Sequence, residues 1–454
     1  MSPGAVGGLF ALNLGYAVMG TAFVWAVRGT PCWSDIARLC GLGYLVGVAA
    51  FGVAWTELLV LGVPFGGVQV AATLVLGTAL GAAAGIWRGM ALPRRTSGSA
   101  SGTTMSLLVT AVGVALVGLL FEAFFRSARL QSVQAFDAWA FWIPKAKAIY
   151  FFGGLDEQIF TVSAGPTYPP LLPILDAAAF HAMGSADVVT LHLQFWFLVL
   201  GSTAAVAGCL APHVPAWALW PSLLLVLTVP RFGEELMAPQ ADVLVDLFFV
   251  VGVLLLALWL RDGRHWRLCP VTLLLAGAAL TKREGLLFAG VALVVAFATA
   301  WPERRRAWPP LAAVTALVVV AAVPWRLWYR SHGIGGEAPS DVGGSGSADR
   351  AWDALRLSVD VLFDSSLWSV LPFALVLSLA FAFAWGSRRQ AVFLGAVAAL
   401  VLFGGAWVTY SYNDLAVTAD EALNPIVRYT GSLALLAAVA MPLLLCPRPK
   451  ERSS

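Results

Sequence analysis

An acid, two lysines and several aromatic residues are crowded between residues 136 and 147, directly after a long apolar segment. Asp137 comes first in this stretch. Only 12% of the 454 residues are charged, so this concentration of charge beside an apolar segment is unusual for the chain. Ionisable groups close to lipid are costly and tend to serve function. Asp137 is therefore our candidate catalytic carboxylate.

A second charged motif, Thr-Lys-Arg-Glu-Gly at 281–285, separates two apolar segments whose far ends are rich in arginine. This pattern predicts a hairpin with both feet on one side of a membrane and Lys282 and Arg283 at the opposite apex. Two adjacent cations at a helix break suit an anion such as a phosphate. The alternative is a solvated turn in which Lys282 pairs with Glu284.

Acids gather before the apolar segment 243–260. Glu234 and Glu235 precede it, and Asp242 stands at its start. These acids could bind a divalent metal or sugar hydroxyls, or simply form a polar loop. Asp246 lies one helical turn beyond Asp242 on the same face, which predicts a polar stripe along a cavity.

Composition places these motifs in a membrane protein. Hydrophobic residues make up 59% of the chain, and the mean hydropathy is +0.82. We predict an all-α, polytopic membrane helix bundle of about 13 spans with short outer-side juxtamembrane helices. The run 171–183 is too short to span and is predicted to be re-entrant or interfacial. The predicted spans are 6–27, 39–61, 68–87, 107–125, 188–210, 214–229, 243–260, 268–280, 286–301, 311–325, 367–385, 391–408 and 433–445.

Charge predicts the orientation of these spans. One set of connections carries 16 of the 28 basic residues and four of the 25 acids. By the positive-inside rule this side is cytoplasmic, with the amino terminus outside and the carboxy terminus inside. The charged motifs described above then meet on the outer side, where we expect a shared polar cavity. The 16 basic residues are Arg28, Arg38, Arg88, Arg94, Arg95, Arg261, Arg264, Arg267, Arg304, Arg305, Arg306, Arg388, Arg389, Arg448, Lys450 and Arg452.

Two long outer connections, 126–187 and 330–366, complete the organisation. The second contains a glycine-rich stretch at 333–347 whose composition is that of a flexible linker. A lid that orders when substrate binds is the alternative. The five cysteines and five histidines are scattered without metal-ligand spacing, so we expect free thiols and no histidine-built metal site.

Four features follow one another along the chain and lie on the same predicted side of the membrane. In this arrangement they resemble the GT-C membrane glycosyltransferases, most closely the protein mannosyltransferase and aminoarabinose transferase group. The features are Asp137 in its aromatic segment, Tyr-Pro-Pro-Leu at 168–171, Thr-Lys-x-x-Gly at 281–285, and Arg428-Tyr429 before the last span. The resemblance covers the chain from about residue 107 onward. It implies a GT-C-like catalytic module at 105–454 with outer loops 126–187 and 330–366. Residues 1–104 then form an N-terminal three-span extension.

The resemblance implies an inverting transfer of a sugar from a polyprenyl-phosphate donor to a lipid, glycan or protein acceptor, with Asp137 as general base. Related members carry a lysine where this chain has Tyr168, so one expected phosphate-binding cation is missing. Its candidate replacements are Lys145, Lys147, Lys282, Arg283 and Arg428. The candidate substrate-binding residues are Trp139, Trp142, Tyr168, Glu234, Glu235, Asp242 and Tyr429.

The aromatic residues have an alternative role, because tryptophans also form the interfacial belt of membrane proteins. No nucleotide-binding loop is present, which fits a lipid donor. The expected location is a bacterial inner (plasma) membrane with the site facing outside. Membrane lipids are expected partners and nucleic acid is not. A divalent metal is an option, and no other cofactor is expected. A lipid-linked-sugar flippase or transporter, or a non-catalytic membrane partner in envelope assembly, remain alternative functions.

Overall fold

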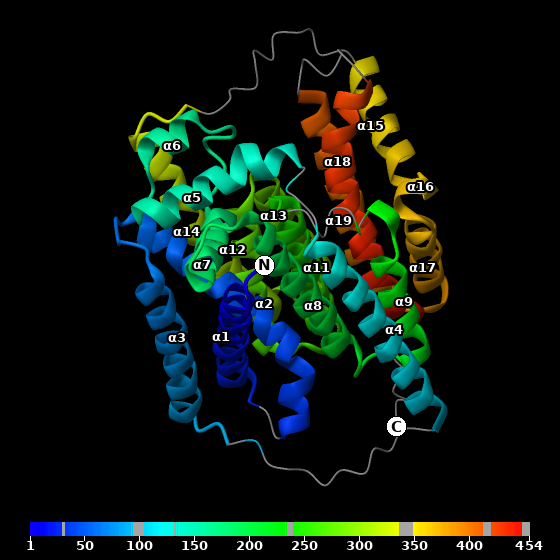
Figure 1. Ribbon diagram of the computed structural model, residues 1–454. Helices are drawn as coiled ribbons and strands as arrows, with labels where there is room; N and C mark the ends of the chain where they lie inside the picture. The colour runs from blue at the N-terminus through cyan, green and yellow to red at the C-terminus, as the bar shows by residue number, and fades with distance from the viewer. Residues whose placement is uncertain are drawn as a thin grey trace.

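The structure is a computed structural model. It describes the chain except residues 30–31, 92, 94–103, 131–132, 134, 232, 234–238, 336–347, 412–418 and 447–454, together with the side chains of 348–350, 408–411 and 419–425. All regular secondary structure in the described part is helical (Figure 1). The predicted all-α class is therefore confirmed.

The amino-terminal half contributes two groups of helices. The first group comprises α1 (Pro3–Arg28), α2 (Trp33–Val60), α3 (Gly67–Trp87) and α4 (Thr104–Ala128). The second comprises η1 (Ala138–Trp142), α5 (Ile143–Phe152), α6 (Glu157–Val162), α7 (Leu171–Met183), α8 (Val188–Leu210) and α9 (Ala216–Leu227). Helices α1 and α2 pack directly against α7 and α8, so the first spans share the core of the bundle.

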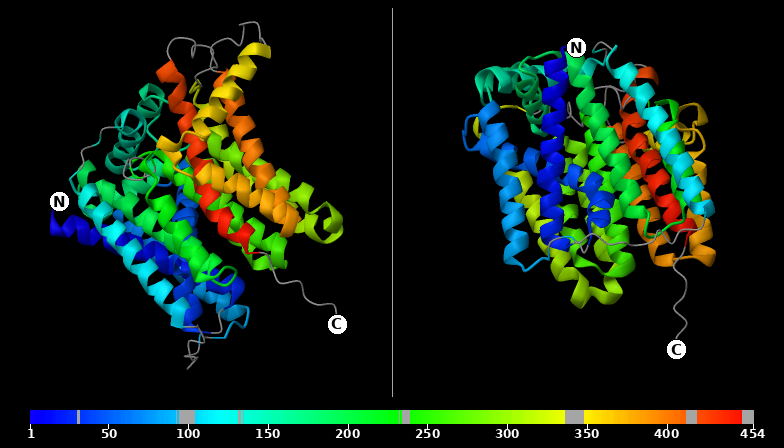
Figure 2. Two further views of the ribbon diagram at one scale, coloured as in Figure 1. Left: turned by 90° about the vertical axis from the view of Figure 1, so that its right-hand side faces the viewer. Right: turned by 60° about the horizontal axis from the view of Figure 1, so that its bottom comes forward.

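The carboxy-terminal half begins with the central helix. Its elements are α11 (Ala241–Asp262), η2 (His265–Arg267), α12 (Leu268–Thr281), α13 (Arg283–Thr299), η3 (Trp301–Glu303), α14 (Arg304–Ser331), α15 (Ala348–Leu362), α16 (Ser365–Trp368), α17 (Leu371–Trp385), α18 (Arg388–Ser411) and α19 (Ala419–Leu445). Helix α11 contacts α8, α12, α13, α18 and α19 and is buried along its whole apolar window. It is the most deeply buried of the membrane-length helices in the described part and lies in the interior of the bundle (Figures 1 and 2).

Nine of the described helices are long and apolar enough to cross a membrane: α1, α2, α3, α4, α8, α11, α18, the stretch Trp301–Ser331 that contains α14, and Ile426–Leu445 of α19. The predicted spans fall on helices, except that 367–385 is interrupted at residues 369–370 between α16 and α17. Helices α9, α12, α13 and α17 have only 12, 14, 17 and 15 residues. A full crossing needs about 20 residues. The multi-pass character is thus clear, while the predicted count of 13 full crossings is not confirmed.

Close backbone approach explains part of the packing. A Cβ on Gly20 would lie 1.8 Å from the carbonyl oxygen of Gly43, and one on Gly47 would lie 2.0 Å from that of Tyr16. Both positions therefore exclude any side chain and let α1 and α2 touch along their backbones, as small residues do in membrane bundles. The predicted interfacial run 171–183 is helix α7, which is largely buried between α1, α2 and α5.

Candidate functional site

The first element of the site is an ion pair between two distant segments. Arg428 Nη1 lies 2.7 Å from Asp137 Oδ2, and the two side chains are 25% and 14% exposed. Asp137 directly precedes the π-helical turn η1, and Arg428 lies on α19. π-Helical turns are rare in proteins, and those that occur are often found at functional sites. This one sets the direction in which the chain leaves Asp137.

The second element is a buried lysine between carboxylates. Lys282 has an extended backbone (φ −154°) at the junction of α12 and α13. Its ammonium lies 2.7 Å from Asp242 Oδ1 and 3.4 Å from Glu284 Oε1, and its side chain is 2% exposed. Burial acts to lower the pKa of Lys282, but the two carboxylates outweigh it and hold that pKa above its ordinary value. Lys282 is therefore a buried, charged group rather than the solvated turn residue of the alternative interpretation.

Gly285 makes this hairpin apex possible. A Cβ at this position would lie 1.9 Å from the carbonyl oxygen of Ala278 on the preceding helix. Any larger residue would push α13 away from α12. The glycine of the Thr-Lys-x-x-Gly motif thus fixes the distance between the helices and, through it, the position of Lys282.

A small cavity joins the two charged elements. It measures about 30 Å³, which is room for about one water molecule. Asp242 and Asp246 of α11 both line it, as predicted for a polar stripe along a cavity. Ser432 donates a hydrogen bond to Asp246. The charged and polar residues that line the cavity are Asp242, Asp246, Lys282, Glu284, Arg428, Tyr429 and Ser432.

Helix α15 touches the lining of this cavity at Tyr429. Ser358 of α15 and Tyr429 of α19 share a hydrogen bond of 2.6 Å between their hydroxyl oxygens. The glycine-rich stretch predicted as a linker or lid lies mostly outside the described residues. The chain immediately after it, however, folds as α15 and contacts α18 and α19.

Aromatic groups connect the outer loop to the hairpin. The Arg283 guanidinium carbon lies 5.4 Å from the ring centre of Tyr168. The Tyr168 ring centre in turn lies 5.5 Å from that of Trp142. Trp142 is fully buried and packs as core, whereas Trp139 is 54% exposed. Of the two tryptophans, only Trp139 is open to contact with lipid or substrate.

The predicted loop lysines do not join the cluster. Lys145 is fully buried and donates a hydrogen bond of 2.6 Å to the carbonyl oxygen of Gly165, with the Trp142 and Phe160 rings within 6 Å. It ties α5 to the loop before Tyr168. Lys147 is half-buried on α5. Glu234 and Glu235 lie outside the described residues, and no group of three potential metal ligands occurs within the described part.

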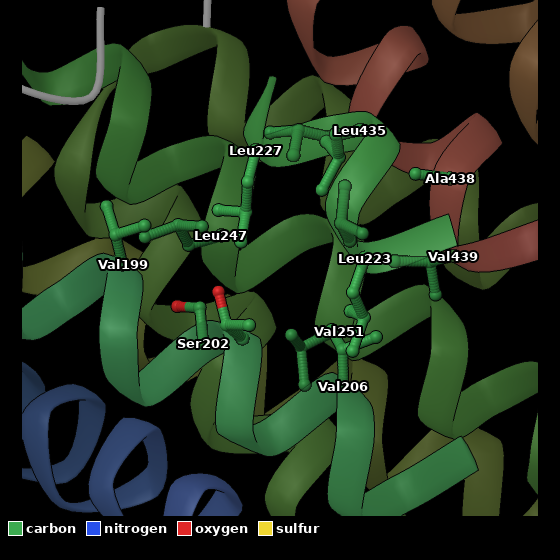
Figure 3. A pocket seen from close by; sticks show the side chains of 13 residues that line it. Val199, Ser202, Val206, Leu223, Leu227, Leu247, Val251, Leu435, Ala438 and Val439 are labelled. Atoms are coloured by element: carbon green, nitrogen blue, oxygen red, sulfur yellow. The ribbon is translucent and has the colours of Figure 1, made fainter. Parts of the chain in front are cut away.

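The hollow shown in Figure 3 has a different character. It lies between α8, α9, α11 and α19, measures about 40 Å³ and is lined mainly by aliphatic side chains. Its Ser202 hydroxyl donates to the carbonyl oxygen of Leu198 at 2.7 Å. With a lining of this kind it is an interior packing gap and offers no acid, base or cation for chemistry.

Sequence reasoning missed how the charged groups pair. It placed Arg428, Lys282 and Asp137 at one membrane surface but predicted neither the Arg428–Asp137 pair nor Asp242 as the counterion of Lys282. The stripe of Asp242 and Asp246 was the available signal, since a buried acid requires a partner of opposite charge.

The structure therefore defines an all-helical, multi-pass membrane protein with a paired charge cluster at one end of its central helix. No protein-family model matches the chain, and neither curated proteins nor solved structures give a significant match.

Proposed function

We propose that this protein is an inverting membrane glycosyltransferase that moves a sugar from a polyprenyl-phosphate donor to an acceptor hydroxyl. The observation that carries the proposal is the 2.7 Å pair of Asp137 with Arg428, close to a second buried acid–base cluster. Such a transfer needs a carboxylate to take the acceptor's proton and cations to stabilise the leaving phosphate. Both kinds of group are present at one end of the bundle.

In this mechanism Asp137 accepts the hydroxyl proton as the acceptor oxygen attacks the anomeric carbon. The bond between that carbon and the phosphate oxygen breaks on the opposite face, and polyprenyl phosphate leaves with its negative charge. Arg428 and Arg283 are the cations that meet this charge. Arg283 is exposed, and Arg428 exchanges part of its contact with Asp137 for the phosphate. Lys282, already neutralised by two carboxylates, positions the hairpin.

Substrate entry requires movement in this mechanism, because a cavity of about 30 Å³ holds no sugar ring. Helix α15 is the element to move, since its Ser358 hydroxyl contacts Tyr429 next to Arg428. Closure over bound substrate would exclude water and so protect the activated sugar from hydrolysis.

The test is Asp137→Asn in the purified protein, assayed with a panel of radiolabelled polyprenyl-phosphate sugars and a membrane lipid extract as acceptor. We expect transfer to fall by about 10²-fold or more, because Asn cannot accept the proton. Asp156→Asn is the matched control: Asp156 caps α6 by accepting from the backbone of Ile159, and Asn caps helices equally well. Transfer by Asp137→Asn at nearly the wild-type rate contradicts the assignment.

The same assay separates the alternatives. A wild-type protein that carries the lipid-linked sugar across a vesicle bilayer without transferring it is a flippase. A protein that neither transfers nor moves the sugar, and whose loss is complemented by Asp137→Asn, is a non-catalytic partner.

The site faces the outside of the cell in this proposal, as the arginine distribution predicts. In a background without the five native cysteines, we expect an impermeant maleimide to label Gln158→Cys on α6 in intact cells. Arg305→Cys, at the start of α14, should react only after the membrane is opened. Both residues are exposed, so accessibility of the side chain does not bias the result. The reverse pattern would invert the orientation.

A further inference from the structure

A second charged region lies at the other end of the bundle, toward the bottom of Figure 1. It is a cavity of about 350 Å³ between the end of α1, the start of α2, the end of α8, the end of α11 and η2. We call it the arginine pocket. Its charged and titratable lining residues are Arg28, Arg38, Cys209, His213, Arg261, Asp262, Arg264 and Arg267.

The arginine pocket carries more positive charge than its own carboxylates neutralise. Five arginines line it, with Asp262 as the acid among its lining residues. Asp35, just outside the lining, accepts from both Arg28 and Arg38. Asp262 accepts from Arg267 and lies 3.5 Å from Arg264. Within the described part of the chain, two carboxylates therefore serve four guanidinium groups, those of Arg28, Arg38, Arg264 and Arg267.

Several of these guanidinium groups are held in place before any ligand arrives. The guanidinium carbons of Arg28 and Arg267 lie 5.4 and 5.6 Å from the ring centre of Trp266. Arg267 also donates to the carbonyl oxygen of Leu258 at 2.7 Å and is 3% exposed. Arg38 donates to the carbonyl oxygen of Gly208 at 2.5 Å. Binding an anion here costs little additional ordering of side chains.

His213 adds a polar group without adding charge. Its ring lies 3.4 Å from Arg267 Nη2. Burial, together with the nearby charges of Arg267 and Arg261, lowers the pKa of His213 to about 4. The ring is therefore neutral near pH 7, and the excess charge of the arginine pocket comes from its arginines alone.

We propose that the arginine pocket is a binding site for a phosphate-bearing anion. Planar guanidinium groups bind phosphate oxygens in pairs and remain charged at every physiological pH. A cavity of about 350 Å³ lies within the size range of small-ligand sites. Two sources share this chemistry: the headgroup of an anionic lipid, which the pocket's place at the helix ends would admit from the membrane surface, or a free phosphorylated molecule.

This site is separate from the proposed catalytic one. Asp242 and Arg261 stand near opposite ends of α11, and 19 helical steps between them correspond to about 28 Å. That distance matches the thickness of a bilayer's hydrocarbon core, about 30 Å. The proposal therefore stands whether or not sugar transfer is found.

The experiment measures anion binding by the full-length protein in nanodiscs. One arm counts phosphatidic acid adducts by native mass spectrometry against a phosphatidylcholine background. The other titrates inorganic pyrophosphate by a change in apparent melting temperature. The test variant is Arg28→Gln combined with Arg264→Gln, and we expect its affinity to fall by about tenfold or more. Arg28→Lys with Arg264→Lys keeps the charge and reports on bidentate geometry.

Arg305→Gln is the matched control. It removes an exposed arginine that lies, like the arginine pocket, at the end of the bundle where α12 begins and α13 ends, but Arg305 does not line the pocket. Loss confined to phosphatidic acid identifies a lipid headgroup as ligand, and loss for both probes identifies a general phosphate site. The proposal is overturned if the double Gln variant folds, shown by its elution and melting profile, and binds both probes like the wild type. Equal loss in Arg305→Gln also overturns it, since charge alone would then explain binding.

Discussion

The two ends of helix α11 handle charge in opposite ways. At the first end, Lys282 and Arg428 are each paired with a carboxylate at 2.7 Å, and Glu284 adds a third acid. At the second end, Asp35 and Asp262 serve four arginines of the described chain. A balanced cluster holds its own groups in position, and its Arg428 meets an anion only by giving up part of its contact with Asp137. An unbalanced one has charge available for an external anion.

Burial follows the same division. Lys282 is 2% exposed, so its charged form is stable in the interior only because carboxylates lie beside it. Arg264 is 61% exposed and can rely on water and counterions. The role of a charged group near a membrane surface therefore depends on its partners and not on how many charges lie nearby.

The first prediction breaks the balanced end. Lys282→Met leaves Asp242 buried without its cation, and the loss of one partner from a buried ion pair costs about 3–5 kcal/mol. We expect the free energy of unfolding in mixed micelles to fall by this amount. Adding Asp242→Asn removes the orphaned charge and should restore part of the stability.

Lys147→Met is the control for this experiment, because it removes a half-buried lysine of α5 and should change stability by less than about 1 kcal/mol. If Lys282→Met is no less stable than the control, the hairpin apex is solvated and the comparison between the two ends fails.

The second prediction concerns the unbalanced end and has a smaller effect. The pKa of His213 is lowered from 6.5 to about 4 in the folded protein, so the unfolded chain takes up a proton first as the pH falls. Folding stability is therefore unaffected above about pH 6.5 and is lost progressively as the pH falls toward about 4. We expect His213→Gln to lose less apparent melting temperature than the wild type between about pH 7 and about pH 5.

Because the ring is half-exposed, solvent screening will limit the difference to a few degrees. His332→Gln, which removes an exposed histidine directly after the C-terminal end of α14, serves as control. Identical pH profiles for His213→Gln and the wild type would show that the arginines do not act on this ring.

The apolar runs predicted the helices well, because lipid forces a continuous segment to satisfy its own backbone hydrogen bonds. The lengths of the membrane crossings were harder to predict. The runs 268–280 and 286–301 form a short helical hairpin, and hydropathy alone cannot distinguish such a hairpin from two full crossings. The site was predicted only in part. Asp137 and Lys282 stood out as charges beside apolar segments, but their partners Arg428 and Asp242 come from other helices. Pairing of that kind depends on tertiary packing.

The arginine pocket could not be predicted from the number of basic residues on one side of the membrane. Arg28, Arg261 and Arg267 entered the sequence argument only as members of a charge bias that orients spans. The same residues line one cavity in the structure, because the helix ends that carry them converge there. The π-helical turn after Asp137 was likewise invisible, since no residue pattern in 138–142 announces a change of helical hydrogen bonding.

The contact at Gly285 has an evolutionary consequence. Cations can be exchanged between helices over generations, since Lys or Arg at several positions could reach one phosphate. The backbone contact of Gly285 with Ala278 allows no such exchange, because a Cβ there would lie 1.9 Å from a carbonyl oxygen. Among distant relatives we therefore expect this glycine to persist where the neighbouring charges have drifted, which makes it the better marker for finding them.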